Sequence, residues 1–340
     1  MNELSRIGVD LAKRVFQVHG VNAREEVVVR RSLGRKEVLG WFAKLPPCLI
    51  GIEACATAHY WGRELAALGH TVRLIPPNYV KAYVRRNKND AIDAAAICEA
   101  VSRPAMRFVE IKTTTQQAVS GMHQVRQLLV KQRTAAMNCL RGLIAEFGIV
   151  APQGMKGFNE LLNILTDATD ARLPEVMRTA LNGLVQTLNI LALQLEKVDK
   201  AILDWGRSDK TTHRLLAIPG LGPITATAVA ARTNPKAFDE AGHFAASLGL
   251  VPRQDGTGGK VRLGSISKRG DGYLRRLLVN GALAVLRSKQ AKQDPWLVTL
   301  MAKNKPLKVV AVALANKNAR IIWALMVRDT DFRPRAAVAA

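Results

Sequence analysis

The chain has 340 residues, and hydrophobic residues make up 48% of them, which allows a sizeable core and excludes a globally disordered protein. Lysine and arginine number 50 against 27 acidic residues, and the formal net charge of +23 favours a polyanionic partner such as nucleic acid. No apolar stretch approaches the length of a membrane span and no signal peptide begins the sequence, so we expect a cytoplasmic protein without a membrane partner.

Strands and helices alternate through the first hundred residues. Short apolar runs predict strands at residues 7–9, 15–18, 26–29, 48–52 and 72–75. Helices are predicted at residues 36–45 and 58–68 and after the turn at 76–78. The order strand-strand-strand-helix-strand-helix-strand-helix is typical of an RNase H-like α/β domain, in which helices cover a mixed sheet. We place this domain at residues 1–148.

Four acidic residues fall where such a domain would bring them together. Asp10 and Glu53 each end an apolar strand, and Asp90 and Asp93 lie three apart in the first turns of a predicted helix. A spacing of three places two side chains on one helix face. Single acidic residues at these places often only cap helices, but the joint placement favours a cage of oxygen ligands for Mg²⁺ or Mn²⁺.

The middle of the chain predicts long helices. Residues 116–147 form one with a basic polar side, and a linker follows at residues 151–154. A heptad seam is then formed by Leu181, Leu184, Leu188, Leu191, Leu195, Val198, Ile202 and Trp205. This seam predicts a coiled-coil connector at residues 149–208 and a dimer or higher assembly, although a long helix buried in its own domain would show the same stripe.

The last part, residues 209–340, is predicted to be mostly helical, with apolar helices at 274–286 and 307–326. Residues 215–226 resemble a helix-hairpin-helix, whose glycines Gly220 and Gly222 would let the backbone approach a phosphate. Residues 252–272 are expected to form a loop rich in glycine and basic residues. The basic residues predicted to bind nucleic acid here are Arg253, Lys260, Arg262, Lys268, Arg269, Arg275 and Arg276.

Together these segments resemble a known family, the DEDD transposases of bacterial insertion sequences, in the "one-ten" group and its "eleven-eleven" subgroup. The resemblance covers nearly the whole chain. Its most specific segments are Ile7-Gly8-Val9-Asp10, Gly51-Ile52-Glu53-Ala54-Cys55 with Ala58-His59-Tyr60-Trp61, Lys88-Asn89-Asp90-Ala91-Ile92-Asp93, Ile218-Pro219-Gly220-Leu221-Gly222 and Gly249-Leu250-Val251-Pro252-Arg253-Gln254.

The resemblance implies an N-terminal domain like that of the RuvC Holliday-junction resolvase, with Asp10, Glu53, Asp90 and Asp93 as its metal-binding residues. It also implies a coiled-coil connector, a C-terminal transposase domain and a place at the bacterial nucleoid. Members of the family use a non-coding guide RNA encoded by the element, which pairs with target and donor DNA duplexes. Four protomers are expected around the two duplexes.

One position departs from the family pattern. Members carry a serine nucleophile in a Ser-Ser-Gly-Gly-Lys setting, and the matching stretch here, Asp255-Gly256-Thr257-Gly258-Gly259-Lys260, has Thr257 at that position. A threonine hydroxyl can attack phosphorus, but its methyl group crowds the approach and stiffens χ1. An active threonine enzyme, an impaired enzyme and another nucleophile, Ser265 or Ser267, are the alternatives, and we favour Thr257 as the nucleophile.

These observations predict a recombinase that cuts and rejoins DNA by metal-assisted transesterification through a covalent protein–DNA intermediate. A metal-dependent nuclease or junction resolvase is the alternative, in which water attacks and no adduct forms. A third hypothesis is a nucleic-acid-binding scaffold whose four carboxylates bind no metal.

Overall fold

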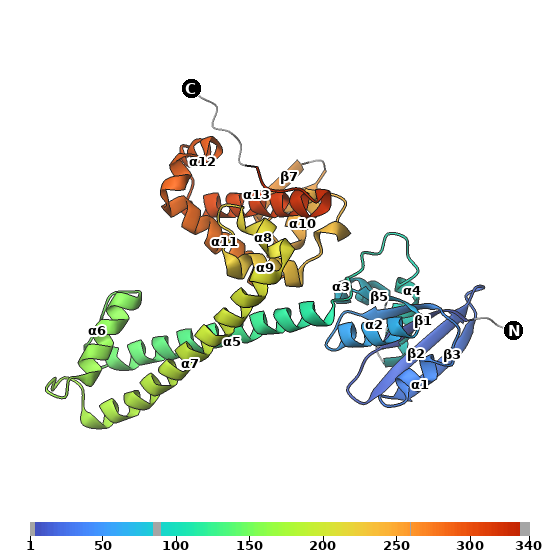
Figure 1. The fold of residues 1–340 in the computed structure, drawn as a ribbon, viewed down its shortest axis with the longest axis horizontal. Helices are drawn as coiled ribbons and strands as arrows, with labels where there is room; N and C mark the ends of the chain where they lie inside the picture. The colour runs from blue at the N-terminus through green and yellow to red at the C-terminus, as the bar shows by residue number, and fades with distance from the viewer. Residues whose placement is uncertain (1–3, 84–89, 259, 334–340) are drawn as a thin grey trace. The chain divides into compact units, whose positions relative to one another are not determined.

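The computed structural model describes residues 4–83, 90–258 and 260–333 of the chain. The chain divides into two compact units, Met1–Thr115 and Gln116–Ala340 (Figure 1). Each unit has its own hydrophobic core, and we describe each by itself.

A mixed five-stranded sheet forms the centre of the first unit. Its strands are β1 (Leu4–Asp10), β2 (Val15–Asn22), β3 (Val27–Gly34), β4 (Leu49–Glu53) and β5 (Thr71–Ile75). Their order is β3-β2-β1-β4-β5, with β1, β4 and β5 parallel and β2 and β3 antiparallel to their neighbours. The predicted RNase H-like α/β arrangement is therefore confirmed for this unit.

Helices cover both faces of the sheet. They are α1 (Val38–Phe42), α2 (Ala58–Ala67), α3 (Pro77–Val80) with the turn η1 (Lys81–Tyr83), and α4 (Asp90–Ala100). Because side chains alternate along a strand, Ile7 and Val9 share one face of β1 and pack in a core with Trp61 and Leu65 of α2. The other face of β1 carries Gly8 and Asp10, and α4 packs there.

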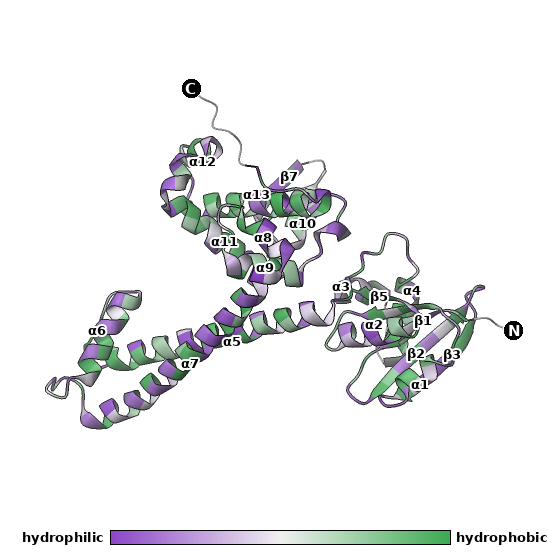
Figure 2. Ribbon diagram, in the orientation of Figure 1, coloured by the Kyte–Doolittle hydropathy of each residue, from purple (hydrophilic) through white to green (hydrophobic). Residues whose placement is uncertain are grey.

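Two long helices and a short one begin the second unit: α5 (Thr114–Ala145), α6 (Met155–Thr166) and α7 (Glu175–Ser208). Figures 1 and 2 show α5 and α7 crossing each other, with polar and apolar residues mixed along both. The predicted seam of α7 is used within the chain, because Leu181 and Leu188 share a core with Leu140 of α5 and Phe158 of α6. Helix α6 was not predicted.

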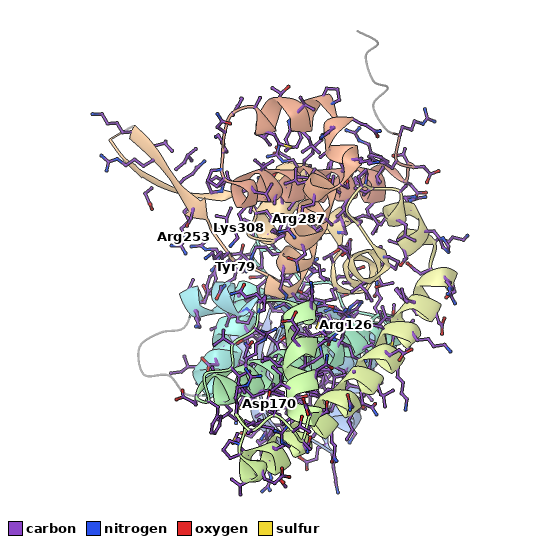
Figure 3. All side chains as sticks on the ribbon, turned by 90° about the vertical axis from the view of Figure 1, so that its left-hand side faces the viewer. Tyr79, Arg126, Asp170, Arg253, Arg287 and Lys308 are labelled. Carbon is purple, nitrogen blue, oxygen red and sulfur yellow. The ribbon has the colours of Figure 1, made fainter. Side chains whose placement is uncertain are left out.

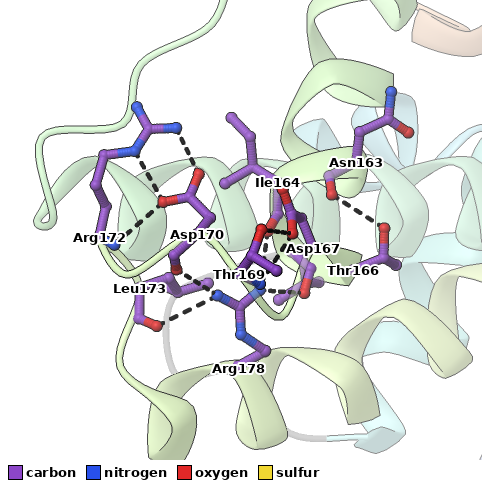
Figure 4. Close-up of polar contacts among 10 residues, drawn as sticks. Asn163, Ile164, Thr166, Asp167, Thr169, Asp170, Arg172, Leu173 and Arg178 are labelled. Atoms are coloured by element: carbon purple, nitrogen blue, oxygen red, sulfur yellow. Dashed lines mark hydrogen bonds and ion pairs between the residues drawn. The ribbon is translucent and has the colours of Figure 1, made fainter.

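A buried arginine joins α6 to α7 (Figure 4). Arg178 is 5% exposed, and its guanidinium donates to the carbonyl oxygens of Ile164 and Leu165 at 2.8 and 2.6 Å. It also donates to the carbonyl oxygens of Asp170 and Leu173 at 2.8 and 3.4 Å. The last carbonyls of a helix have no partner within that helix, so Arg178 caps α6 and fixes the loop that follows.

Replacing Arg178 with methionine is expected to destabilise the second unit by about 3 kcal/mol, because buried carbonyl groups lose their donors. Arg172→Met is the matched control. Arg172 is exposed and pairs with Asp170 beside the same loop, so its loss is expected to cost less than ~1 kcal/mol. Urea unfolding of both variants measures the difference, and equal free energies of unfolding would contradict the capping role.

The remainder of the second unit is mostly helical. Its helices are α8 (Lys210–Leu216), α9 (Pro223–Arg232), α10 (Ala241–Ser247), α11 (Gly272–Arg287), α12 (Pro295–Met301) and α13 (Leu307–Arg328), with short turns η2 (Pro235–Ala237) and η3 (Lys289–Lys292). The expectation of a loop at residues 252–272 was wrong for most of that segment. Strands β6 (Pro252–Thr257) and β7 (Lys260–Ile266) pair there as an antiparallel hairpin, because glycines at its turn end permit tight reversal.

Helix α13 corrects a second expectation. Among the described residues, this helix is long and apolar enough to cross a membrane by length and composition, so the expectation that no apolar stretch approaches that length was wrong here. Its apolar side is, however, part of the core, where Val310, Leu314 and Ile322 are buried with residues of α11. A helix that is apolar on most sides is also what the centre of a globular domain requires.

Candidate active site and nucleic-acid interface

The first two predicted ligands lie on neighbouring strands. In the parallel pair of β1 and β4, Gly8 lies opposite Gly51 and Val9 opposite Ile52. Asp10 and Glu53 are the next residues and end the two strands. Residues that are opposite in register point to the same face of a sheet, so both half-buried carboxylates belong to the face that α4 covers.

Two glycines let α4 lie directly on this face. A Cβ atom added to Gly8 would lie 2.2 Å from the carbonyl oxygen of Ala94, and one added to Gly51 would lie 2.8 Å from the side chain of Val101. Any larger residue would therefore push α4 away from the strand ends. The family motifs contain both glycines, but only the structure shows that they are needed for the close approach of α4.

The direction of α4 brings its first turn towards Asp10. Arg6, near the start of β1, donates from Nε to the carbonyl oxygen of Cys98 at 2.9 Å. Gly8, two residues further on, lies against Ala94. The helix thus runs opposite to β1, and its start at Asp90 and Asp93 comes to the end of the strand that carries Asp10.

The described side chains do not form a complete metal cage. Asp93 is half-buried on α4, and the side chain of Asp90 lies outside the described residues. In the described part of the chain, no three His, Cys, Asp or Glu side chains are grouped closely enough to hold a metal ion. The structure therefore pairs Asp10 with Glu53 and directs α4 towards them, and the four-ligand site remains a prediction.

The thiol of Cys55 is affected by the negative charges at the ends of β1 and β4. The pKa of the Cys55 thiol is raised, first by desolvation and then by the charges of Glu53 and Asp10. Both carboxylates therefore lie close enough to act on one sulfur atom. Carboxylates gathered at two strand ends supply the hard oxygen ligands that a divalent ion such as Mg²⁺ prefers.

His59 has a structural role in the same unit. Its Nδ1 accepts a hydrogen bond from the backbone N–H of Lys112 at 3.2 Å, and the nearby Arg63 donates to the Lys112 carbonyl at 2.8 Å. Burial, followed by the charges of Lys112 and Arg63, lowers the pKa of His59 to about 4. His59 thus fixes the segment after α4 against α2, a contact that no local sequence pattern indicates.

The predicted nucleophile lies at the tip of the β6–β7 hairpin. Thr257 ends β6 and is the register partner of Lys260, and Gly258 in the turn has a φ of +59°. The side chain of Thr257 lies outside the described residues. Ser265 and Ser267 lie at the opposite end of the hairpin, where Ser267 donates its N–H to the Val251 carbonyl at 2.9 Å.

The predicted helix-hairpin-helix segment consists of α8, a turn at residues 217–222 and α9. Gly220 has a φ of +88°, and a Cβ on Gly281 of α11 would lie 1.8 Å from the Gly220 carbonyl oxygen. Close packing within the fold therefore accounts for Gly220. A Cβ on Gly222 would meet nothing within 4 Å, so the space beside Gly222 is open to a ligand.

The predicted basic residues surround the hairpin and the start of α11. Figure 3 shows Arg253 near the base of the hairpin and Lys308 on α13. The exposed ones are Arg253, Lys260, Arg262, Lys268, Arg269 and Arg276. Arg275 instead donates from Nη1 to the carbonyl oxygens of Leu248 and Arg269 at 3.0 and 2.8 Å, so it also holds the segment before α11 in place.

A buried polar network, not predicted from the sequence, joins α5 to α9 and α11. His123 is fully buried between the Tyr273 hydroxyl at 3.0 Å and the Thr227 hydroxyl at 3.2 Å. Burial, with the charges of Arg232 and Arg126, lowers the pKa of His123 to about 4. Asp271 caps α11 and accepts from Arg232 at 2.7 Å. The network fixes the N-terminal end of α11.

Because of His123, the free energy of unfolding is expected to fall in acid. The pKa of His123 is lowered in the folded state, so the unfolded chain takes up the proton first as the pH falls below about 6.5. The loss attributable to His123 is expected to reach about 2 kcal/mol at pH 5. His123→Gln keeps a polar side chain without this titration, so it should lose less stability than the wild type between pH 7.5 and pH 5. Equal losses would contradict the assignment.

The fold and the site define a nucleic-acid enzyme with an RNase H-like unit followed by a basic helical unit. Comparison with known proteins agrees with this class. A family model described as "Transposase" matches residues 7–149, and one described as "Transposase IS116/IS110/IS902 family" matches residues 212–296. The chain is 53% identical to a probable family 20 transposase of Pseudomonas aeruginosa, over 97% of this chain and 99% of the relative.

Two further relatives agree. The transposase for insertion sequence element IS1328 of Yersinia enterocolitica is 39% identical over 98% of this chain and 99% of its own length. The transposase for insertion sequence element IS1111A of Coxiella burnetii is 38% identical over 98% of this chain and 92% of its own length. The chain therefore belongs to the IS116/IS110/IS902 family of insertion-sequence transposases and is of the DEDD type.

Proposed function

We propose that this transposase is guided by an RNA of its element and cuts and rejoins DNA through a covalent protein–DNA intermediate. The observation that supports metal-assisted cleavage in this proposal is the register of β1 and β4, which sets Asp10 beside Glu53 on the face covered by α4; RNA guidance and the covalent step follow from the family resemblance. The same fold with a water nucleophile would be a nuclease or junction resolvase, so the nucleophile distinguishes the alternatives.

The carboxylates fit a divalent ion by their chemistry. Asp10 and Glu53, with Asp93 and Asp90 from the first turn of α4, would supply only oxygen ligands, as Mg²⁺ and Mn²⁺ require. When bound there, the ion supplies Lewis acidity towards the scissile phosphate. Glycines at Gly8 and Gly51 keep α4 close enough for ligands from the helix and the strands to meet.

Thr257 would carry out the covalent step. Its hydroxyl oxygen attacks the phosphorus atom, the bond from phosphorus to the leaving DNA oxygen breaks, and that oxygen takes up the proton. A hydroxyl of the new DNA strand then attacks the same phosphorus and releases Thr257. The number of phosphodiester bonds is unchanged, so no ATP is needed. The position at the end of β6, at a hairpin tip, suits a group that must reach a phosphate.

The nucleic-acid interface would be shared between the hairpin and the turn after α8. Gly222 offers open backbone, and Gly220 sets the turn that presents it. The cationic residues are Arg253, Lys260, Arg262, Lys268, Arg269, Arg275 and Arg276. Such residues contact phosphates and position DNA without reading its sequence. Base pairing by the guide RNA would supply the sequence specificity, in the bacterial nucleoid.

The chain would have three functional parts, at residues 1–148, 149–208 and 209–340. The two matched regions, 7–149 and 212–296, support this division because they leave the whole of α6 and α7 between them. The connector would also join protomers into dimers and tetramers. Apolar side chains remain exposed after α5 and α7 have packed: Ile190 and Leu193 lie in the connector, and Val125, Leu128 and Leu143 lie on α5, which precedes it.

One experiment distinguishes the transposase from the nuclease. The full chain is incubated with Mg²⁺, the guide RNA and a nicked DNA substrate labelled at one end, and the products are separated by denaturing electrophoresis. A labelled species that migrates slowly and disappears after protease treatment is expected. Complete hydrolysis without such a species would support the nuclease instead.

A further inference from the structure

A groove in the second unit lies at the base of the β6–β7 hairpin, between α11 and α13. Its volume is about 350 Å³, within the ~300–1,000 Å³ of small-ligand sites. The residues around it are Ile266, Lys268, Gly272, Arg275, Arg276, Val279, Asn280, Leu283, Lys308 and Val312. They come from the end of β7 with the loop after it, from α11 and from α13, so the folded domain forms the groove.

The lining has two chemically different parts. Ile266, Val279, Leu283 and Val312 are half-buried apolar residues that form its floor. Lys268, Arg276 and Lys308 are exposed and, with Arg275, form a cationic rim. No ion pair within the described part of the chain involves any of these four cations, so their charge is available to an anionic ligand.

The positions of two rim groups are fixed by contacts within the fold. The Arg276 guanidinium lies 5.6 Å from the centroid of the Tyr273 ring, a cation–π distance. Arg275 is held by the carbonyl oxygens of Leu248 and Arg269. The amides at the start of α11 are not available, because Asp271 accepts from the N–H groups of Tyr273 and Leu274 at 2.8 and 3.2 Å. A ligand would therefore meet side-chain cations and an apolar floor rather than a helix terminus.

An apolar floor inside a cationic rim matches a nucleotide better than a bare phosphate. A phosphate alone would gain nothing from Val279, Leu283 or Val312. An unpaired nucleotide, in contrast, has a base with apolar faces and a sugar with a phosphate on each side. Asn280, exposed at the edge of the groove, offers an amide donor and acceptor to a base edge. A paired base cannot enter because it remains stacked in the duplex.

We propose that this groove binds one unpaired nucleotide of the transposase's DNA substrate, with the base on the apolar floor and its phosphates at the cationic rim. DNA is favoured over RNA because Ile266 and Lys268 place the groove at the base of the hairpin that carries Thr257 at its tip, so an unpaired strand freed by cleavage at the tip would reach the groove by following the hairpin. This choice rests on the proposed function. The groove itself depends only on DNA binding, which the family implies.

Photo-crosslinking through the base tests the proposal. The full chain is irradiated with single-stranded DNA that carries 5-iodo-2′-deoxyuridine, digested with trypsin and analysed by mass spectrometry. Crosslinks are expected in the peptides 277–287 and 309–317, which contain Val279, Leu283 and Val312. Crosslinks only in other peptides, equal yields from the same base in a duplex, or higher yields from an iodouridine RNA would overturn it.

Matched variants make the test specific. Arg276→Gln is expected to lower the crosslink yield roughly tenfold, because a charge-assisted contact to phosphate is lost. Arg287→Gln removes an exposed arginine near the end of the same helix, outside the groove (Figure 3), and should leave the yield within twofold. Equal yields from the two variants would contradict the proposal. Asp10→Asn should keep the crosslink even if cleavage is lost, so failure of the catalytic assignment remains distinguishable from failure of the groove.

Discussion

Replacing Asp10 with asparagine is expected to lower the rate of DNA cleavage by roughly 10³-fold, and Glu53→Gln is expected to do the same. Each change removes one negative charge from the paired ends of β1 and β4 while keeping the size of the side chain. Folding and DNA binding should therefore persist. The rate is measured on labelled DNA with Mg²⁺, and circular dichroism checks the fold.

Glu110→Gln is the control for these two variants. Glu110 is an exposed acidic residue in the same unit, and its removal should leave the cleavage rate unchanged. If Asp10→Asn cleaved DNA as fast as this control, the carboxylates would have no part in catalysis. The enzyme would then use another catalytic centre, or the chain would be a nucleic-acid-binding scaffold whose four carboxylates bind no metal.

Thr257→Val is expected to remove the covalent adduct completely, because valine keeps the branched shape of threonine and lacks the hydroxyl. Thr257→Ser is expected to form the adduct at least as fast as the wild type, since it lacks the methyl group that crowds the approach to phosphorus. Denaturing electrophoresis of the nicked substrate measures both. An adduct that persisted in Thr257→Val would identify another nucleophile, and Ser265→Ala and Ser267→Ala would then be tested in the same assay.

The sheet could be predicted because each of its strands is a short apolar run with clear ends. Runs ending at Asp10 and Glu53 became neighbouring strands, and their parallel register set the two carboxylates side by side. Helix α6 was not predicted, although Phe158, Leu161 and Leu165 recur at helical spacing. A helix of twelve residues is only marginally stable without tertiary packing, which α5 and α7 supply here. The heptad seam of α7 was identified, but not that it packs against α5 and α6 of the same chain.

Other features depended on contacts between distant residues. The close approach of Gly8 to Ala94, and of Gly220 to Gly281, cannot be deduced from local sequence, because each joins segments far apart in the chain. The same is true of the buried hydrogen bonds of His123 and Arg178. The hairpin at residues 252–266 was expected to be a loop because β6 (PRQDGT) has no alternating apolar residues. In β7, Val261 and Leu263 do alternate with polar residues, but glycines interrupt the segment and both side chains are exposed.

Calorimetric titration of the full chain with Mn²⁺ tests most directly whether the four carboxylates form a metal site. The wild type should bind the ion saturably, and Asp10→Asn should bind at least roughly tenfold more weakly, while Glu110→Gln should match the wild type. Binding that is absent from the wild type, or unchanged in Asp10→Asn, would contradict the metal site and with it the catalytic mechanism proposed for this transposase.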